Sequence, residues 1–235
     1  MAKSVTKPAP PEVVVPNISV SITGEPKTGK TTQACSFPGP IKLLSFDLRA
    51  KWVVSKMQDK RIDVSNYPLP TVDTLNPTKE QYWAEDFWQQ IKKDAYEAID
   101  SGEYKTLVLD PATFLWEIVR SACAEEENRA KLGKARDYGE ANIRMRGLFN
   151  RAVMGGMNLV AVSYLKDVWV DDKPTGETKL DGWKHILSLS DVLLNTEYRG
   201  KKFITTIQRN GFDPSLNFKE FESFTYDDLI TLLGV

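Results

Sequence analysis

The sequence predicts an α/β fold in which a mostly parallel central sheet is flanked by helices and closed by an antiparallel C-terminal hairpin. Apolar, β-rich segments alternate along the chain with segments of helical periodicity. One of the first apolar segments leads into residues 24–31, which fit the phosphate-binding pattern G-x-x-x-x-G-K-[ST] at every fixed position. Near the C-terminus, two strand-like segments surround Arg199-Gly200-Lys201, as the strands of a hairpin surround their turn.

Length and composition favour one domain with a short extension. A chain of 235 residues can form a single α/β domain with a substantial core. We expect this domain at residues 17–235. Residues 1–16 are expected to form a flexible or neighbour-docking arm, because their prolines and polar residues disfavour a helix or a central strand. The 31 basic and 32 acidic residues exclude a globally basic nucleic-acid-binding protein but not a local basic face.

The sequence gives no sign of a membrane segment or of cysteine chemistry. The first 16 residues have no apolar signal core, and no stretch approaches the roughly 18 apolar residues that a membrane span needs. Cys35 and Cys123 match no metal or redox spacing, so we expect both to be reduced core residues. A cytoplasmic protein without a membrane partner is therefore expected.

The most specific motif is the P-loop pattern, which lies between a predicted strand and a predicted helix. Its glycines allow main-chain N–H groups to turn inward around phosphates, Lys30 would reach the β- and γ-phosphates, and Thr31 would bind Mg²⁺. ATP and Mg²⁺ are the expected cofactors. The alternative interpretation is a surface turn rich in glycine and lysine. The residues expected to contact the nucleotide are Gly24, Glu25, Pro26, Lys27, Thr28, Gly29, Lys30, Thr31 and Thr32.

Two further strands end in carboxylates. Residues 41–46 predict a short strand that ends at Asp47, and residues 104–110 predict a buried strand that ends at Asp110. Asp110 is placed to serve as the second metal-side group of a P-loop enzyme, the Walker-B aspartate. The alternative for Asp110 is a helix cap, because Pro111 follows it.

The remaining segments continue the alternation. The polar residues 166–184, punctuated by glycine and proline, predict a long loop, and such loops in a compact domain usually bind something or are disordered. The other expected elements are an edge excursion at 49–77, helices at 78–99, 112–128 and 137–154, a basic loop at 129–136, a core strand at 157–163 and a last helix at 226–233, capped by Thr225.

The order of these elements resembles the RecA-like ATPase core, and its details are most similar to phage-encoded RecA-like ATPases associated with single-strand annealing and recombination. The resemblance covers residues 17–233. Besides the P-loop, it is carried by Asp137-Tyr138-Gly139-Glu140, by residues 157–164, by Thr175-Gly176-Glu177 and by Phe224-Thr225-Tyr226-Asp227-Asp228-Leu229.

The resemblance implies a DNA-dependent ATPase that binds ATP at the subunit interfaces of a homo-oligomer, a ring or a filament, in the host cytoplasm. It further implies single-stranded DNA and a single-strand-binding protein as partners. Two loops, at about 129–140 and 166–184, would contact the DNA through lysine–phosphate contacts and stacked aromatic rings, including that of Tyr138. The alternative is solvated charged loops with Trp183 packed inward. The expected DNA-binding residues are Lys131, Lys134, Arg136, Lys166, Trp169, Lys173, Lys179, Trp183 and Lys184.

The sequence departs from the RecA pattern at the residue that activates water. RecA proteins carry an acidic pair after the second strand, whereas here Asp47 is present and Arg49 takes the place of the glutamate. Slow hydrolysis is therefore expected, with Asp47 first and Glu25 second as candidates for positioning water. Ser163 or Tyr164 could sense the γ-phosphate.

The hairpin supplies a candidate for catalysis across a subunit interface. Arg209 lies where RecA-like proteins place basic residues that reach a neighbour's ATP, and a guanidinium suits the charge on the γ-phosphate. The alternative is an ordinary hairpin arginine. The apolar Val13-Val14-Val15 could add an edge strand to an adjacent subunit. Together with Lys30, Asp47, Glu25 and Ser163, Arg209 completes the candidate catalytic set.

Two other function classes share a P-loop. A small-molecule or nucleotide kinase would need a lid with arginines that closes over a second substrate, and the sequence shows no clear lid. A nucleotide-gated structural or partner-binding protein with little hydrolysis agrees with the missing glutamate.

Overall fold

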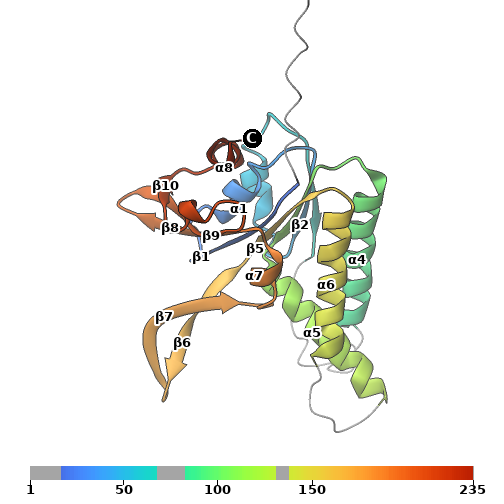
Figure 1. Cartoon of the computed structure of the whole chain (residues 1–235). Coiled ribbons are helices and arrows are strands. Elements are labelled where there is room, and N and C mark those ends of the chain that lie inside the picture. The colour runs from blue at the N-terminus through green and yellow to red at the C-terminus, as the bar shows by residue number, and fades with distance from the viewer. Residues whose placement is uncertain (1–16, 68–82, 131–137, 235) are drawn as a thin grey trace, which may run out of the picture.

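The computed structural model describes residues 17–67, 83–130 and 138–234. An eight-stranded sheet has the order β10-β9-β8-β1-β5-β4-β2-β3, and β6 and β7 form a separate two-stranded sheet (Figure 1). The strands are β1 (Ser19–Gly24), β2 (Ile41–Ser45), β3 (Ile62–Asn66), β4 (Thr106–Asp110), β5 (Asn158–Val162), β6 (Tyr164–Val170), β7 (Lys173–Asp181), β8 (Val192–Arg199), β9 (Lys202–Asn210) and β10 (Glu220–Glu222). The helices are α1 (Lys30–Ala34), α2 (Ala50–Val54), α4 (Trp83–Ser101), α5 (Ala112–Ala130), α6 (Gly139–Met154), α7 (Ile186–Leu189), α8 (Tyr226–Leu233) and the 3₁₀ turn η1 (Pro214–Leu216).

The large sheet is mostly parallel. The six strands from β8 to β3 run parallel to one another, whereas β9 and β10 are antiparallel additions at one edge. The predicted fold class is therefore confirmed, including the C-terminal hairpin of β8 and β9. Because parallel strands end at the same edge, the segments that follow β1, β2, β4 and β5 meet there.

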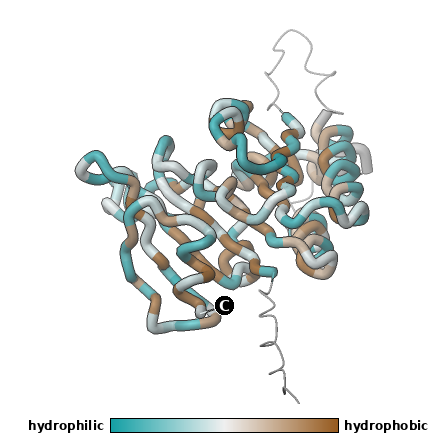
Figure 2. Tube along the Cα trace, turned by 90° about the horizontal axis from the view of Figure 1, so that it is seen from above, coloured by the Kyte–Doolittle hydropathy of each residue, from teal (hydrophilic) through white to brown (hydrophobic). Residues whose placement is uncertain are grey.

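Two hydrophobic cores lie on the two faces of the sheet, and the alternation of side chains along each strand feeds both. On β4, Leu107 and Leu109 join the core beneath α4, α5 and α6, whereas Val108 joins the core beneath α1 and α8. In Figure 2 the hydrophobic stretches follow the strands, whereas many peripheral loops are hydrophilic. Burial on both faces explains why the central strands have nearly continuous apolar sequences.

The helices agree with the predicted periodicity. α4, α5 and α6 pack side by side on one face of the sheet (Figure 1), and α8 begins with a capping box in which Thr225 and Asp228 bond each other's main-chain N–H groups. The predicted edge excursion consists of α2 and the edge strand β3, and residues 68–82 lie outside the described part of the chain.

The predicted long loop at residues 166–184 is wrong, because most of it forms the antiparallel hairpin of β6 and β7. Asp171 and Asp172 make the turn, with φ angles of 50° and 58°. A two-residue turn with two positive φ angles matches the twist of a hairpin, but its usual sequence is Asn-Gly or Asp-Gly, so Asp-Asp gave a weak signal. The ribbon projects away from the main sheet (Figure 1).

One hydroxyl holds the root of the β6–β7 hairpin. The Oγ1 atom of Thr113, on α5, accepts a hydrogen bond from the Tyr164 N–H at 3.0 Å and donates one to the Asp181 carbonyl at 2.6 Å. Tyr164 and Asp181 are the first and last paired residues of the ribbon. Both strands therefore leave the domain at the same point on α5.

Candidate functional site

The P-loop forms a tight bend between β1 and α1. Gly24 and Gly29 have φ angles of 146° and 90°, and Lys27 has a φ of 68°. A Cβ atom at Gly24 would lie 2.2 Å from the Thr196 carbonyl oxygen of β8, so only glycine fits there. The bend therefore depends on both backbone freedom and close packing against the neighbouring strand.

Lys30 closes the bend from inside. Its Nζ atom donates hydrogen bonds to the carbonyl oxygens of Gly24 at 2.8 Å and of Glu25 at 2.6 Å. Burial lowers the pKa of Lys30 to about 8, although the nearby Asp110, Glu25 and Asp47 act in the opposite direction. The ammonium group is thus held in a desolvated position, where an anion would find a strong partner.

Thr31 and Asp110 meet beside this lysine. The Thr31 Oγ1 atom donates a hydrogen bond to Asp110 Oδ2 at 2.6 Å, although 79 positions separate the two residues in the chain. Burial raises the pKa of Asp110 to about 6, with Asp47 adding to the effect and the Thr31 hydrogen bond and Lys30 opposing it. A hydroxyl and a carboxylate in contact are the hard oxygen donors that Mg²⁺ prefers, so these two residues fit a magnesium site.

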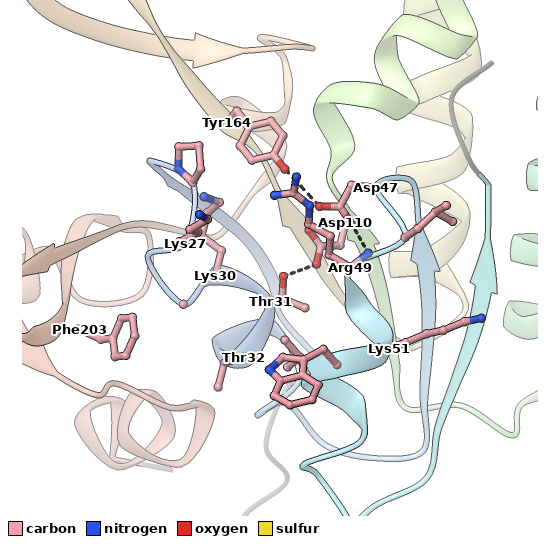
Figure 3. Close-up of a pocket in the computed structure, with 15 residues that line it drawn as sticks. Lys27, Lys30, Thr31, Thr32, Asp47, Arg49, Lys51, Asp110, Tyr164 and Phe203 are labelled. Atoms are coloured by element: carbon pink, nitrogen blue, oxygen red, sulfur yellow. Dashed lines mark hydrogen bonds between the residues drawn. The ribbon is translucent and has the colours of Figure 1, made fainter. Parts of the chain in front are cut away.

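A cavity of about 730 Å³ opens over these groups (Figure 3). Asp47 borders it, and its Oδ2 atom accepts a hydrogen bond from the Tyr164 hydroxyl at 3.3 Å. The Lys30 Nζ atom lies 5.1 Å from the centre of the Tyr164 ring. Burial, followed by Asp47 and Asp110, raises the pKa of Tyr164 to about 12, so this hydroxyl keeps its proton at neutral pH.

The cavity combines fixed positive charge with carboxylates on one wall. Its cations are Lys27, Lys30, Arg49 and Lys51. Such an arrangement can hold a polyphosphate through ammonium, guanidinium and main-chain N–H groups. The carboxylates of Asp47 and Asp110 border the same cavity and can hold a cation or orient a water molecule against that anion.

The other catalytic candidates have different positions. Glu25 is exposed and does not line the cavity, so the geometry favours Asp47 as the group that orients water. Ser163 is buried and also does not line the cavity, whereas Tyr164 does. Of the two hydroxyls considered as γ-phosphate sensors, only that of Tyr164 reaches the site.

Arg209 lies away from the cavity of its own chain. The P-loop residue Gly24 pairs with Thr196 on β8, and Thr196 in turn pairs with Thr205 on β9. Arg209 is four residues further along β9, about 13 Å away at the usual rise of a strand. Its side chain is exposed. Arg209 does not line the cavity of its own chain, and its exposed side chain is open to contact with a neighbouring chain.

The residues predicted to bind DNA fall into three groups. Lys131, Lys134 and Arg136 lie outside the described residues. Exposed side chains are found on the β6–β7 hairpin and just after it, at Lys166, Trp169, Lys173, Lys179 and Lys184. Lys166 forms an ion pair with Asp181 at 2.6 Å.

The third group is Trp183, for which the prediction of base stacking is wrong. Its side chain is only 2% exposed, and its Nε1 atom donates a hydrogen bond to Asn142 Oδ1 at 2.8 Å. The indole packs against Phe149 and Trp116. Burial of a large ring outweighs its use as a stacking surface here, because the ring joins the chain after the hairpin to α5 and α6.

The cavity also has walls that the sequence did not indicate. Lys51 and Trp52 come from α2, and Phe203 comes from the start of β9. α2 follows β2 at the edge of the sheet where the P-loop lies, so a systematic search of the segments after parallel strands could have included it. Phe203 had no such signal, because its position depends on β8 pairing with β1.

The chain matches a known family in sequence and is similar to a solved structure. The sequence profile of a family described as an AAA domain matches residues 16–215. Among solved structures, a KaiC-like protein from the hyperthermophilic archaeon Pyrococcus horikoshii OT3 is similar, with 14% identity, coverage of 87% of this chain and 84% of that chain, and a TM-score of 0.46. No curated protein sequence matches the chain. Among the described helices, none has the length and apolar character needed to cross a membrane.

Proposed function

The chain belongs to the AAA domain family, and on that premise we propose that it hydrolyses Mg·ATP while acting on single-stranded DNA in phage recombination or strand annealing. Its fold is that of a RecA-like P-loop ATPase domain. The observation that best supports nucleotide chemistry is the contact of Thr31 with Asp110 beside the buried Lys30 ammonium group. These are the metal and phosphate groups that a P-loop enzyme needs.

The residues of the cavity suggest how the chain would handle a triphosphate. Lys30 now donates to two neutral carbonyl oxygens, and phosphate oxygens would replace them as stronger, charged acceptors. Thr31 and Asp110 would hold Mg²⁺, which neutralises charge on the phosphate oxygens when it is bound. Asp47 would orient the attacking water, with the Tyr164 hydroxyl fixing the position of its carboxylate.

One observation supports a second candidate function. Arg49 borders the cavity at the position where related ATPases carry a catalytic glutamate. A guanidinium cannot accept a proton from water, so a nucleotide-gated binding protein with little hydrolysis agrees with the same site. The site therefore has a guanidinium where an efficient ATPase has a carboxylate, and a measured turnover rate decides between the two functions.

An ATPase assay with and without single-stranded DNA separates these functions. Turnover stimulated by DNA supports the proposed function. Tight ATP binding without turnover supports the gated binding protein, and turnover that requires a small-molecule acceptor instead of DNA would identify a kinase. Turnover that is indifferent to DNA would contradict the proposed DNA dependence.

The β6–β7 hairpin is the described surface that best fits single-stranded DNA. Trp169 is 59% exposed, and Lys173 and Lys179 lie on the same ribbon. Aromatic stacking tolerates any base, and lysines bind phosphates. Five acidic residues on the hairpin, Asp167, Asp171, Asp172, Glu177 and Asp181, reduce its positive potential. We therefore expect stacking to contribute strongly relative to charge.

Replacing Trp169 with alanine should lower the affinity for single-stranded DNA by about 5- to 100-fold, the range expected for the loss of one stacked base. Fluorescence anisotropy with a labelled oligonucleotide measures this change, and a salt titration measures the lysine contribution. Phe212→Ala, at an exposed aromatic residue outside the hairpin, is the matched control. Unchanged affinity in Trp169→Ala, or binding that is insensitive to salt, would argue against this surface.

Assembly is proposed from two features, the position of Arg209 and the apolar arm. Arg209 is exposed and does not line the cavity of its own chain, so it would act on the ATP of a neighbouring chain. Val13-Val14-Val15 lie outside the described residues, and their role in docking to a neighbour rests on sequence alone. A single-strand-binding protein is a further proposed partner.

We expect deletion of residues 1–16 to reduce the mass in solution to that of one chain, as measured by light scattering. Arg209→Ala should keep the assembled mass but lose turnover. Mixing Arg209→Ala with a P-loop variant that cannot bind ATP should restore part of the turnover, because intact sites form where a nucleotide-binding chain meets an intact arginine. An unchanged oligomer after the deletion, or a mixture without activity, would count against the arrangement.

A further inference from the structure

A second, uncharged cavity lies directly beside the phosphate cavity. Its volume is about 230 Å³, and it has three residues in common with the larger cavity, Gly29, Thr32 and Phe203. None of its lining side chains is charged. Figure 3 shows Phe203 on the side of the P-loop away from Asp47 and Asp110. A ligand that fills both cavities would therefore have a charged part over Lys30 and a neutral part beside Phe203.

Gln33 marks this second cavity as a recognition site. The residue lines the cavity and is 7% exposed, yet neither its Nε2 nor its Oε1 atom has a hydrogen-bond partner among the described residues. Its main chain is fixed, because its N–H donates to the Gly29 carbonyl and its carbonyl accepts from the Ser36 hydroxyl. A buried amide with no partner is costly, and such groups in folded proteins call for an explanation, such as a ligand.

The aromatic wall is held against the P-loop. Phe203 is 45% exposed, and a Cβ atom added to Gly29 would lie 3.2 Å from the Phe203 Cδ1 atom. The Phe203 ring packs against the Tyr198 ring, with ring centres 5.0 Å apart. The main-chain carbonyl oxygen of Phe203 accepts a hydrogen bond from the Ser223 N–H at 2.9 Å. An aromatic face that is partly open and fixed in place is a stacking surface for a flat heterocycle.

We propose that this cavity is the nucleobase subsite and that it selects adenine. The inference rests on the proposed ATPase function and adds the residues that recognise the base. Phe203 would stack on the base, and the Gln33 amide would accept from the adenine amino group N6 and donate to the ring nitrogen N7. The same amide matches adenine and not guanine, because guanine presents two acceptors, O6 and N7, along that edge.

The test compares Mg·ATP, Mg·GTP and inorganic tripolyphosphate as calorimetric ligands of the full chain. The wild type should bind ATP at least tenfold more tightly than GTP or tripolyphosphate. Gln33→Met keeps the length of the side chain but cannot form the two hydrogen bonds, so it should weaken ATP binding by about 5- to 100-fold, as expected for one bidentate pair. Binding of tripolyphosphate should not change. Phe203→Leu should also weaken ATP binding selectively.

Two controls accompany these variants. Gln89→Met changes the same residue type on α4, where Gln89 is exposed and bonds Glu85, and it should leave all three affinities unchanged. Trp52→Ala removes another aromatic side chain of the phosphate cavity, one that is 71% exposed and lies on α2. A selective loss of ATP binding in Trp52→Ala but not in Phe203→Leu or Gln33→Met would place the base on α2 and overturn the proposal.

The outcomes distinguish the subsite from the proposed function. If the wild type binds tripolyphosphate as tightly as ATP, or if Gln33→Met binds ATP like the wild type, the nucleobase subsite is overturned while the phosphate site stands. If the wild type binds neither ATP nor tripolyphosphate, the proposed function fails and the subsite fails with it. Equal losses for ATP and tripolyphosphate in Gln33→Met would show a disturbed P-loop and would also overturn base selection.

Discussion

Replacing Lys30 with alanine is expected to weaken Mg·ATP binding by about 30- to 5,000-fold and to abolish turnover. The range corresponds to the about 2–5 kcal/mol lost when one partner of a buried, hydrogen-bonded charge pair is truncated. The structure places the Lys30 ammonium group inside the bend, where it is desolvated and bonded to Gly24 and Glu25. Isothermal titration calorimetry measures the affinity, and thermal unfolding checks the fold.

A matched substitution tests whether the effect depends on the position of Lys30 or only on the loss of one positive charge. Lys93→Ala removes an exposed lysine of α4 that forms a 3.9 Å ion pair with Glu97, and it should not change ATP binding. In the wild type, the affinity should fall as pH rises above about 8, because Lys30 loses its proton there in the ligand-free protein. Unchanged ATP affinity in Lys30→Ala would show that the phosphates do not bind in this cavity.

Replacing Asp110 with asparagine should have two opposite effects. Turnover should fall by at least 100-fold, because the metal would lose its charged ligand and with it part of the electrostatic stabilisation of the transferred phosphoryl group. The ligand-free protein should nevertheless become more stable at pH 7.5. Burial raises the pKa of Asp110 from 3.8 to about 6, so the charged form costs about 3 kcal/mol at neutral pH.

The sign of this effect can be checked by its pH dependence. The folded pKa is raised, so the contribution of Asp110 to stability is fully present below about pH 3.8 and is lost as pH rises through about 6. Asp110→Asn should therefore unfold at a higher temperature than the wild type at pH 7.5, and the difference should shrink towards pH 4. Asp63→Asn is the control with the opposite sign, since the hydrogen bond from Arg61 lowers the pKa of Asp63. A less stable Asp110→Asn at pH 7.5, or one with wild-type turnover, would contradict the prediction.

The sequence could predict the elements that have a strong local pattern. β4 reads as a continuous apolar run that ends in a carboxylate, and such a strand must be buried on both faces. The meeting of Thr31 with Asp110 follows from one rule, that parallel strands end at the same edge of a sheet. The contact between Thr31 and Asp110 could thus be predicted without knowing the order of the strands in the sheet.

Other parts of the site depend on contacts that no local pattern encodes. Ser163 follows the last residue of β5, and Tyr164 begins β6. Neighbouring side chains along an extended chain point to opposite faces, so the sequence could not choose between the two hydroxyls. The burial of Trp183 depends on Asn142, Phe149 and Trp116, which come from other helices. Tertiary packing also decided the position of Phe203.

The β6–β7 hairpin is attached to the domain close to the phosphate cavity. The Thr113 hydroxyl bonds both strands where the hairpin begins, and the first residue of β6, Tyr164, donates a hydrogen bond from its own hydroxyl to Asp47. β6 has seven residues, which gives an arm about 20 Å long at the usual rise of a strand. A tilt of about ten degrees at this point would move the far turn by about 3 to 4 Å, so a small movement beside Asp47 would produce a larger one at Asp171 and Asp172.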